Sequence, residues 1–350
     1  MGKIGMYMYG IINANTKFFW DKDDISFNKK VYTIPHQDIS AIVNDAEIVN
    51  YTHLNKEFLA RMLISHQRVL EEVMNTGYTV VPVRLGTFAV NKKEVMNILA
   101  TGYTKIKDIC NKINNKIEID VVAVWNDFSS ILKEIGKEKE IMEFKKSVLN
   151  NSEGITYENR IRMGTMVKEA LDKKREQYAC QIRNVLSTVV GRDFKIHELM
   201  NDTMVLNIAF LVDKSMHESF DRKIEELNID FAEKLNFRCI GPLPPFSFNT
   251  LEIKKMSFEE IDWARKKLGL NNNLTNKEKI KKAYYKSSLV FHPDKNPHTP
   301  GIENEFNSVK KAYDILSEYC TSVQSENGNG SFSLEETAFA KNPIVINVRD

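Results

Sequence analysis

Apolar positions along the first 250 residues follow two alternating spacings, and this alternation predicts a mixed α+β architecture. Segments rich in β-branched and aromatic residues are typical of strands, and they occur at 3–12, 31–35, 39–43, 78–90, 117–125, 205–212 and 237–248. Between them, apolar residues recur at helical spacing over 56–74, 128–149, 157–190 and 218–235. The later group favours an open sheet with helices on one face, close to a ferredoxin-like domain.

The helix expected over 157–190 carries an unusually dense run of charge. The charged residues are Lys168, Asp172, Lys173, Lys174, Arg175 and Glu176. We interpret this run as a solvated face, with a partner-binding face as the alternative.

Three further helical patterns follow near the C-terminal end. The first has an apolar seam at Phe258, Ile261, Ala264 and Leu268, and Gly269 is placed to end it. Thr275 and Glu278 have the spacing of a capping box, which predicts a helix starting near Asn276. Its apolar seam is Ile280, Ala283, Tyr284 and Phe291, and its remaining surface is basic through Lys277, Lys279, Lys281, Lys282 and Lys286.

A proline-containing turn ends that helix. Pro293 lacks an N–H and disfavours helical dihedrals in the residue before it, so His292-Pro293-Asp294 predicts a loop. The helical period then restarts at Phe306, Val309, Ala312, Tyr313 and Leu316. The two helices are expected to fold back on each other as an antiparallel hairpin.

This combination over about residues 256–320 resembles a J domain, the module that recruits the ATP-driven DnaK-class chaperone. The alternative is an ordinary helical hairpin. The resemblance implies that His292, Pro293 and Asp294 trigger the chaperone ATPase, and that Lys281, Lys282 and Lys286 attract an acidic partner. Ser287 and Ser288 stand where the family usually has Leu and Ala. Since burying a leucine contributes roughly 1.5–3 kcal/mol, we expect this J domain to be less stable than most.

Three motifs in the first 250 residues resemble a second family, the gas vesicle proteins of the GvpL/GvpF type. They are Tyr7-Met8-Tyr9-Gly10-Ile11, the segment 81–88 containing Arg84 and Gly86, and the segment 241–248 containing Gly241, Pro242, Pro244 and Pro245. Each motif also has a purely structural interpretation: Arg84 as a strand-end charge, and Gly-Pro-x-Pro-Pro as a rigid turn. The resemblance covers about residues 3–250 and implies an accessory role in gas vesicle assembly, with the shell protein GvpA and other gas vesicle accessory proteins as partners.

Composition narrows the remaining possibilities. Hydrophobic residues make up 42% of the chain and charged residues 27%, with a net charge of +2, so no global charge favours nucleic acid. Cysteines 110, 180, 239 and 320 are far apart, and no metal-ligand or catalytic motif is found, so we expect neither an enzyme nor a cofactor. The apolar run 4–12 is far shorter than the roughly 18 residues of a membrane span. A cytoplasmic protein that acts at the gas vesicle fits these observations.

The resulting prediction is two α/β sandwich-like domains followed by an all-α hairpin. Residues 1–112 are the N-terminal α+β domain, 113–250 a modified ferredoxin-like domain with long helices, 256–320 the J domain, and 321–350 a flexible tail. Within the tail, the run 343–348 is β-prone, and its alternative to disorder is to add to a sheet edge. The predicted function is an assembly factor that binds GvpA and brings DnaK to it. The alternative is a general J-domain co-chaperone with a different client.

Overall fold

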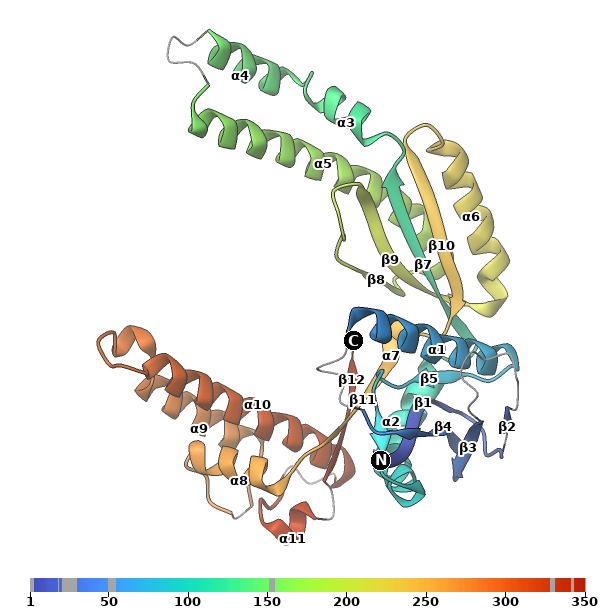
Figure 1. Cartoon of the computed structure of the whole chain (residues 1–350), viewed down its shortest axis with the longest axis vertical. Coiled ribbons are helices and arrows are strands. Elements are labelled where there is room, and N and C mark those ends of the chain that lie inside the picture. The colour runs from blue at the N-terminus through green and yellow to red at the C-terminus, as the bar shows by residue number, and fades with distance from the viewer. Residues whose placement is uncertain are drawn as a thin grey trace. The chain divides into compact units, whose positions relative to one another are not determined.

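The computed structural model describes residues 3–17, 19–20, 30–49, 55–150, 155–272, 274–327, 331–340 and 343–349. These residues form two compact units (Figure 1). One unit combines 1–112 with 249–350, and the other comprises 113–248. The chain therefore leaves the first unit after Lys112 and returns to it at Asn249.

The first unit opens with a sheet and two packed helices. Its elements are β1 (Ile4–Ile12), β2 (Phe19–Trp20), β3 (Val31–His36), β4 (Ile39–Glu47), α1 (Lys56–Asn75), β5 (Val80–Pro82), β6 (Phe88–Ala89) and α2 (Lys92–Lys112). The strand order is β2-β3-β4-β1-β5, and β6 also pairs with β1. The single strand expected over 78–90 is two short strands, because a turn at Arg84–Gly86 interrupts it. Helix α2 was not predicted.

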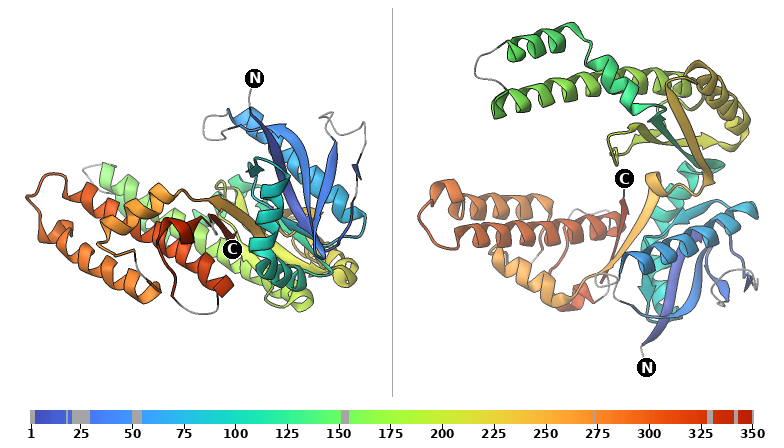
Figure 2. Two further views of the ribbon diagram at one scale, coloured as in Figure 1. Left: turned by 90° about the horizontal axis from the view of Figure 1, so that it is seen from below. Right: turned by 45° about the horizontal axis from the view of Figure 1, so that its top comes forward.

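The second unit is an antiparallel sheet with added helices. Its elements are β7 (Lys116–Trp125), α3 (Phe128–Ile135), α4 (Lys139–Leu149), α5 (Tyr157–Val190), β8 (Phe194–Ile196), β9 (Met204–Asp213), η2 (Lys214–Met216), α6 (His217–Asp230), β10 (Leu235–Leu243) and α7 (Phe246–Asn249). The order β10-β7-β9-β8 is that of a ferredoxin-like sheet, with α5 and α6 packed on it and on each other. Helices α3 and α4 are additions that pack along α5 (Figure 2). The predicted α+β class is confirmed.

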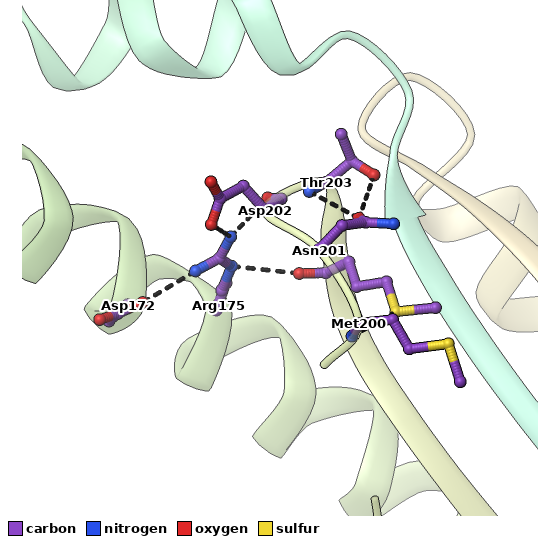
Figure 3. Close-up of polar contacts among 7 residues, drawn as sticks. Asp172, Arg175, Met200, Asn201, Asp202 and Thr203 are labelled. Carbon is purple, nitrogen blue, oxygen red and sulfur yellow. Dashed lines mark hydrogen bonds and ion pairs between the residues drawn. The ribbon is translucent and has the colours of Figure 1, made fainter. Parts of the chain in front are cut away.

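One charge in the run on α5 is buried, which corrects the expectation of a fully solvated face. Arg175 is 9% exposed, and its guanidinium reaches the loop before β9 (Figure 3). Its Nε donates to the Met204 carbonyl at 3.1 Å, and its remaining nitrogens contact Asp172 and Asp202. A planar, always charged guanidinium can saturate several acceptors at once, and so it fastens the β8–β9 loop to the helix.

The C-terminal helices form the expected hairpin. They are α8 (Phe258–Lys267), α9 (Lys277–Val290), η3 (Pro293–Lys295) and α10 (Ile302–Asn327). Gly269 follows α8 with φ +65°, and its N–H bonds to the Lys266 carbonyl, as a glycine that ends a helix does. The predicted capping box at the start of α9 was wrong. Asn276 caps the helix by accepting from the Lys279 N–H, whereas Thr275 is buried in a backbone bridge to Phe332.

Residues beyond α10 form a helix and a strand instead of a flexible tail, and the alternative that 343–348 joins a sheet edge is confirmed. They include α11 (Glu336–Phe339) and β12 (Ile344–Arg349), which pairs antiparallel with β11 (Thr250–Lys255). Phe332, Leu334 and Phe339 are buried in the same cluster as Ile261, Val309 and Leu316 of the hairpin. The C-terminal segment therefore completes the hydrophobic core of the helical hairpin.

Strand β12 also contacts the N-terminal sheet domain within the same unit. The Ile346 carbonyl accepts from Lys105 Nζ of α2 at 2.6 Å, and the Ile346 side chain lies where a Cβ on Gly102 would stand. Lys255 forms an ion pair with Glu94 of α2, and β11 continues as a parallel bridge from Leu251 to Val83. The β11–β12 ladder thus links the J-type hairpin to α2 and β5.

We predict that Leu334→Ala destabilises the helical hairpin although Leu334 lies outside it in sequence. Leu334 is fully buried, and deleting a leucine from a core typically costs about 2–5 kcal/mol. Native-state hydrogen exchange of the α8 and α10 amides should report this loss, and Thr337→Ala at an exposed neighbouring position should leave protection unchanged. Equal protection in Leu334→Ala and wild type would show that the segment does not belong to this core.

Candidate functional site

The His-Pro-Asp turn is held in shape by local hydrogen bonds while its polar groups remain accessible. His292 Nδ1 accepts from the Asp294 N–H at 3.2 Å, and Asn296 Nδ2 donates to the carbonyls of Val290 and His292. The His292 ring also packs edge-on against Phe306 of α10, with ring centroids 5.5 Å apart. The Asp294 side chain is 89% exposed. The loop therefore presents a carboxylate and an imidazole edge on a rigid turn.

The solvent face of α9 leads directly into this turn. Lys281, Lys282 and Lys286 are exposed on it, as predicted, and Lys281 Nζ lies 5.7 Å from the Tyr285 ring centroid. Exposed Tyr285, Leu289 and Val290 share the face at helical spacing. This surface is basic and apolar at once, a composition suited to binding a partner with acidic and apolar groups.

Helix α9 carries two serines, Ser287 and Ser288, at positions where the family usually has Leu and Ala. Ser288 Oγ is buried without a hydrogen-bond partner among the described residues. A buried unpaired hydroxyl costs roughly 1–3 kcal/mol. Elsewhere in the hairpin the C-terminal segment adds apolar contacts, because Phe332, Leu334 and Phe339 join its core.

The first two gas-vesicle-type motifs meet in one place. Val83 N donates to the Tyr9 carbonyl, and Met8 N donates to the Thr87 carbonyl, so the turn at Arg84–Gly86 is tied to β1. Gly86 has φ +87°, a conformation that favours glycine. Arg84 forms an ion pair with Glu252 of β11, and its N–H donates to the Leu251 carbonyl at 2.8 Å. Arg84 thus positions β11 against β5.

A buried histidine completes this arrangement. Tyr7 Oη lies 2.7 Å from His66 Nδ1, and the two rings are 5.7 Å apart, edge to face. Burial lowers the pKa of His66 to about 4, so the imidazole is neutral at physiological pH. In the sequence His66 is a lone histidine on an amphipathic helix, and its partner Tyr7 lies 59 residues away along the chain.

The third motif closes the sheet of the second unit. A Cβ on Gly241 would stand 2.9 Å from the Glu118 carbonyl, so the close approach of this segment to β7 requires glycine. Pro244 and Pro245 are buried, whereas Pro242 is exposed. Gly241 and Pro242 thus lie at a register shift of β10 against β7, and the rest of the motif leads into α7 where the chain leaves the unit.

Glu118 anchors this turn, and the sequence did not identify it. Its carboxyl accepts from Ser247 N at 2.8 Å and from Ser247 Oγ at 2.7 Å, and His197 Nε2 lies 3.1 Å from the same hydroxyl. Burial raises the pKa of Glu118 to about 7, and it also raises the pKa of nearby Asp120. The signal that the sequence offers for this site is an acidic residue, Glu118, within an otherwise apolar strand pattern.

These observations define the class of protein: an α+β protein joined to a J-type helical hairpin. Residues 5–250 match the family described as "Gas vesicle synthesis protein GvpL/GvpF", and residues 266–320 match the DnaJ domain. The chain belongs to the GvpL/GvpF family and carries a J domain at its C-terminal end, as the sequence motifs predicted.

Individual relatives support both assignments. The gas vesicle protein F of Microcystis aeruginosa (strain PCC 7806) is 23% identical over 253 residues, which are 71% of this chain and 99% of that protein. The crystal structure of gas vesicle protein GvpF from Anabaena sp. PCC7120 matches with a TM-score of 0.59 at 21% identity, covering 69% of this chain and 97% of that one. A chaperone protein DnaJ of Herminiimonas arsenicoxydans is 47% identical over 64 residues, which are 18% of this chain and 15% of that protein.

The described part of the chain contains neither a membrane-spanning helix nor a metal-binding cluster. No helix there is both long and apolar enough to span a bilayer. No group of three or more histidine, cysteine or acidic side chains there has a metal-binding arrangement.

We predict that Glu118 makes the stability of the second unit depend on pH. Its folded pKa of about 7 exceeds the ordinary 4.5, so the folded state retains a proton between these values that the unfolded chain releases. The stabilising contribution is full below pH 4.5 and is lost as the pH rises through 7. Glu118→Gln cannot titrate, so its unfolding free energy relative to wild type should rise by about 2–3 kcal/mol between pH 5 and pH 8.

Urea unfolding across this pH range measures the difference. Glu225→Gln, at an exposed position of α6, is the matched control and should track wild type at every pH. A Glu118→Gln difference that is flat with pH would contradict a protonated, buried carboxyl.

Proposed function

We propose that this protein is a gas vesicle assembly factor that binds the shell protein GvpA and recruits a DnaK-class chaperone to it. We place its work in the cytoplasm and at the gas vesicle. The observation that carries the proposal is an exposed His-Pro-Asp turn beside a basic helix, in a chain whose first 250 residues belong to the GvpL/GvpF family.

The chaperone end of the proposal assigns roles to particular residues. His292, Pro293 and Asp294 form the trigger, since the turn is rigid and its carboxylate is exposed. Lys281, Lys282 and Lys286 steer an acidic chaperone surface, because clustered like charges raise encounter rates more than they raise affinity. Tyr285 and Leu289 supply apolar contact area beside them.

The client end rests on the family. Gas vesicle shell subunits are apolar. Because exposed apolar strands are prone to aggregation, such a subunit needs protection until it has assembled. A domain that holds such a subunit next to a J domain gives DnaK a client at high effective concentration. The β11–β12 ladder supports this coupling, since its strands flank the J domain and contact the N-terminal domain directly, β11 through the bridge to Val83 and β12 through α2.

We predict that His292→Gln abolishes stimulation of DnaK ATPase and leaves the fold intact. The side chain is about 41% exposed, and its contacts among the described residues are with the turn and Phe306. Steady-state ATPase assays with full-length protein measure the loss, and circular dichroism checks the fold. His298→Gln, an exposed histidine in the same loop, should stimulate like wild type. Unchanged ATPase stimulation by the His292→Gln protein would contradict the proposed role of the J domain.

The client prediction is independent of the chaperone. We expect immobilised full-length protein to retain GvpA from a soluble fusion, and His292→Gln protein to retain it equally, because the substitution lies in the J domain. An immobilised isolated DnaJ protein is the control for general client binding. Retention no greater than on this control would favour a general co-chaperone with another client.

A further inference from the structure

A small aromatic cavity lies between α1 and the N-terminal sheet. Its volume is about 220 Å³, compared with the roughly 150 Å³ of an engineered protein cavity that accommodates benzene. It exists because α1 packs closely on the sheet only from His66 onward. In its first half, Phe58, Leu63 and Ile64 remain exposed. The space is therefore large enough for one side chain.

Strand register builds the floor of this cavity. Tyr7 of β1 pairs with Asn44 of β4 on one side and with Phe88 of β6 on the other. Residues directly opposite each other in an antiparallel pair project to the same face, so these three side chains form one row. Tyr9 adds a second tyrosine, with its ring centroid 4.7 Å from that of Tyr7. The exposed Phe58 of α1 lines the open side.

The cavity lining offers acceptor oxygens and, among the described residues, no cation. Asn44 is 1% exposed, lines the cavity, and its Oδ1 has no hydrogen-bond partner among the described residues. Glu47 lines the mouth with an exposed carboxylate for which no ion pair is found in the described part of the chain. None of the described lining residues is Lys or Arg, and His66 behind Tyr7 is neutral because burial lowers its pKa.

We infer that this cavity binds an arginine side chain presented by a partner protein. A guanidinium is planar, always positively charged and stacks on aromatic faces, and so it matches tyrosine and phenylalanine rings beside the Glu47 carboxylate. This inference concerns a surface remote in sequence from the J domain and does not depend on the proposed function.

The test uses full-length protein and three small probes in NMR titrations. N-acetyl-arginine N-methylamide should shift the amide signals of Tyr7, Asn44 and Phe88. The citrulline analogue replaces the guanidinium by an uncharged urea, and the leucine analogue is purely apolar. We expect both to bind at least about fivefold more weakly than the arginine probe, the difference that one cation–π contact or ion pair provides.

Matched variants locate the site. Glu47→Gln and Phe58→Ala should each raise the dissociation constant of the arginine probe about fivefold or more. Glu57→Gln repeats the first change, and Leu63→Ala removes another exposed apolar side chain, both at α1 positions outside the cavity; each should stay within about twofold of wild type. All four positions are exposed, so the fold should persist.

Three outcomes would overturn the inference. The arginine probe could leave the cavity amides unshifted. The citrulline or leucine probe could bind as tightly, which would make the cavity merely apolar. The control variants could weaken binding as much as Glu47→Gln and Phe58→Ala do, which would place the probe elsewhere on α1.

Discussion

The pairing of β11 with β12 is the constraint on which the first unit depends. Six residue pairs, from Thr250 with Arg349 to Lys255 with Ile344, bring the end of the chain back to the strand that precedes the J domain. Without this ladder, the helical hairpin would be joined to the N-terminal sheet domain by a single connection. Because β12 also contacts α2 through Ile346, the ladder fixes the hairpin at both ends of its sequence.

The residues of the family motifs also hold together elements that are distant in sequence. Arg84 holds β11 through Glu252, and Gly86 allows the turn that brings Arg84 there. At the other end, Gly241 permits close approach to β7, and Ser247 is held by Glu118. In each case the motif residue stabilises a place where the chain passes from one element to a distant one. A structural role therefore accounts for the geometry of these residues.

Much of this could be predicted from the sequence, for definite physical reasons. Helix α5 and the J-domain helices have long apolar periods and clear ends, so their positions follow from local pattern. Helix α2 was missed because its buried residues, such as Ile98 and Ile106, are diluted by polar and small residues. Strand β8 has three residues, too few for a period to appear. Thr275 was mistaken for a cap because its bridge partner, Phe332, lies 57 residues away along the chain.

The polar pairs show the limit most clearly. Tyr7 with His66 and Glu118 with Ser247 each join residues at least 59 positions apart, and each polar group is typical of a surface when viewed alone. The pKa of His66 is lowered and the pKa of Glu118 is raised. Both shifts have one cause, because burial disfavours the charged form of the imidazole and of the carboxyl alike.

The stability of the J domain connects these themes. We expect a short helical hairpin that carries Ser288 where the family usually has an apolar residue to have little excess stability. Phe332, Leu334 and Phe339 add apolar surface to its core, and β12 then ties that segment to α2. The C-terminal segment consequently serves two purposes with one stretch of chain: it stabilises the hairpin and fixes it to the N-terminal domain. Loss of that segment should therefore destabilise the J domain and at the same time detach it from the N-terminal domain, because the same stretch of chain provides both sets of contacts.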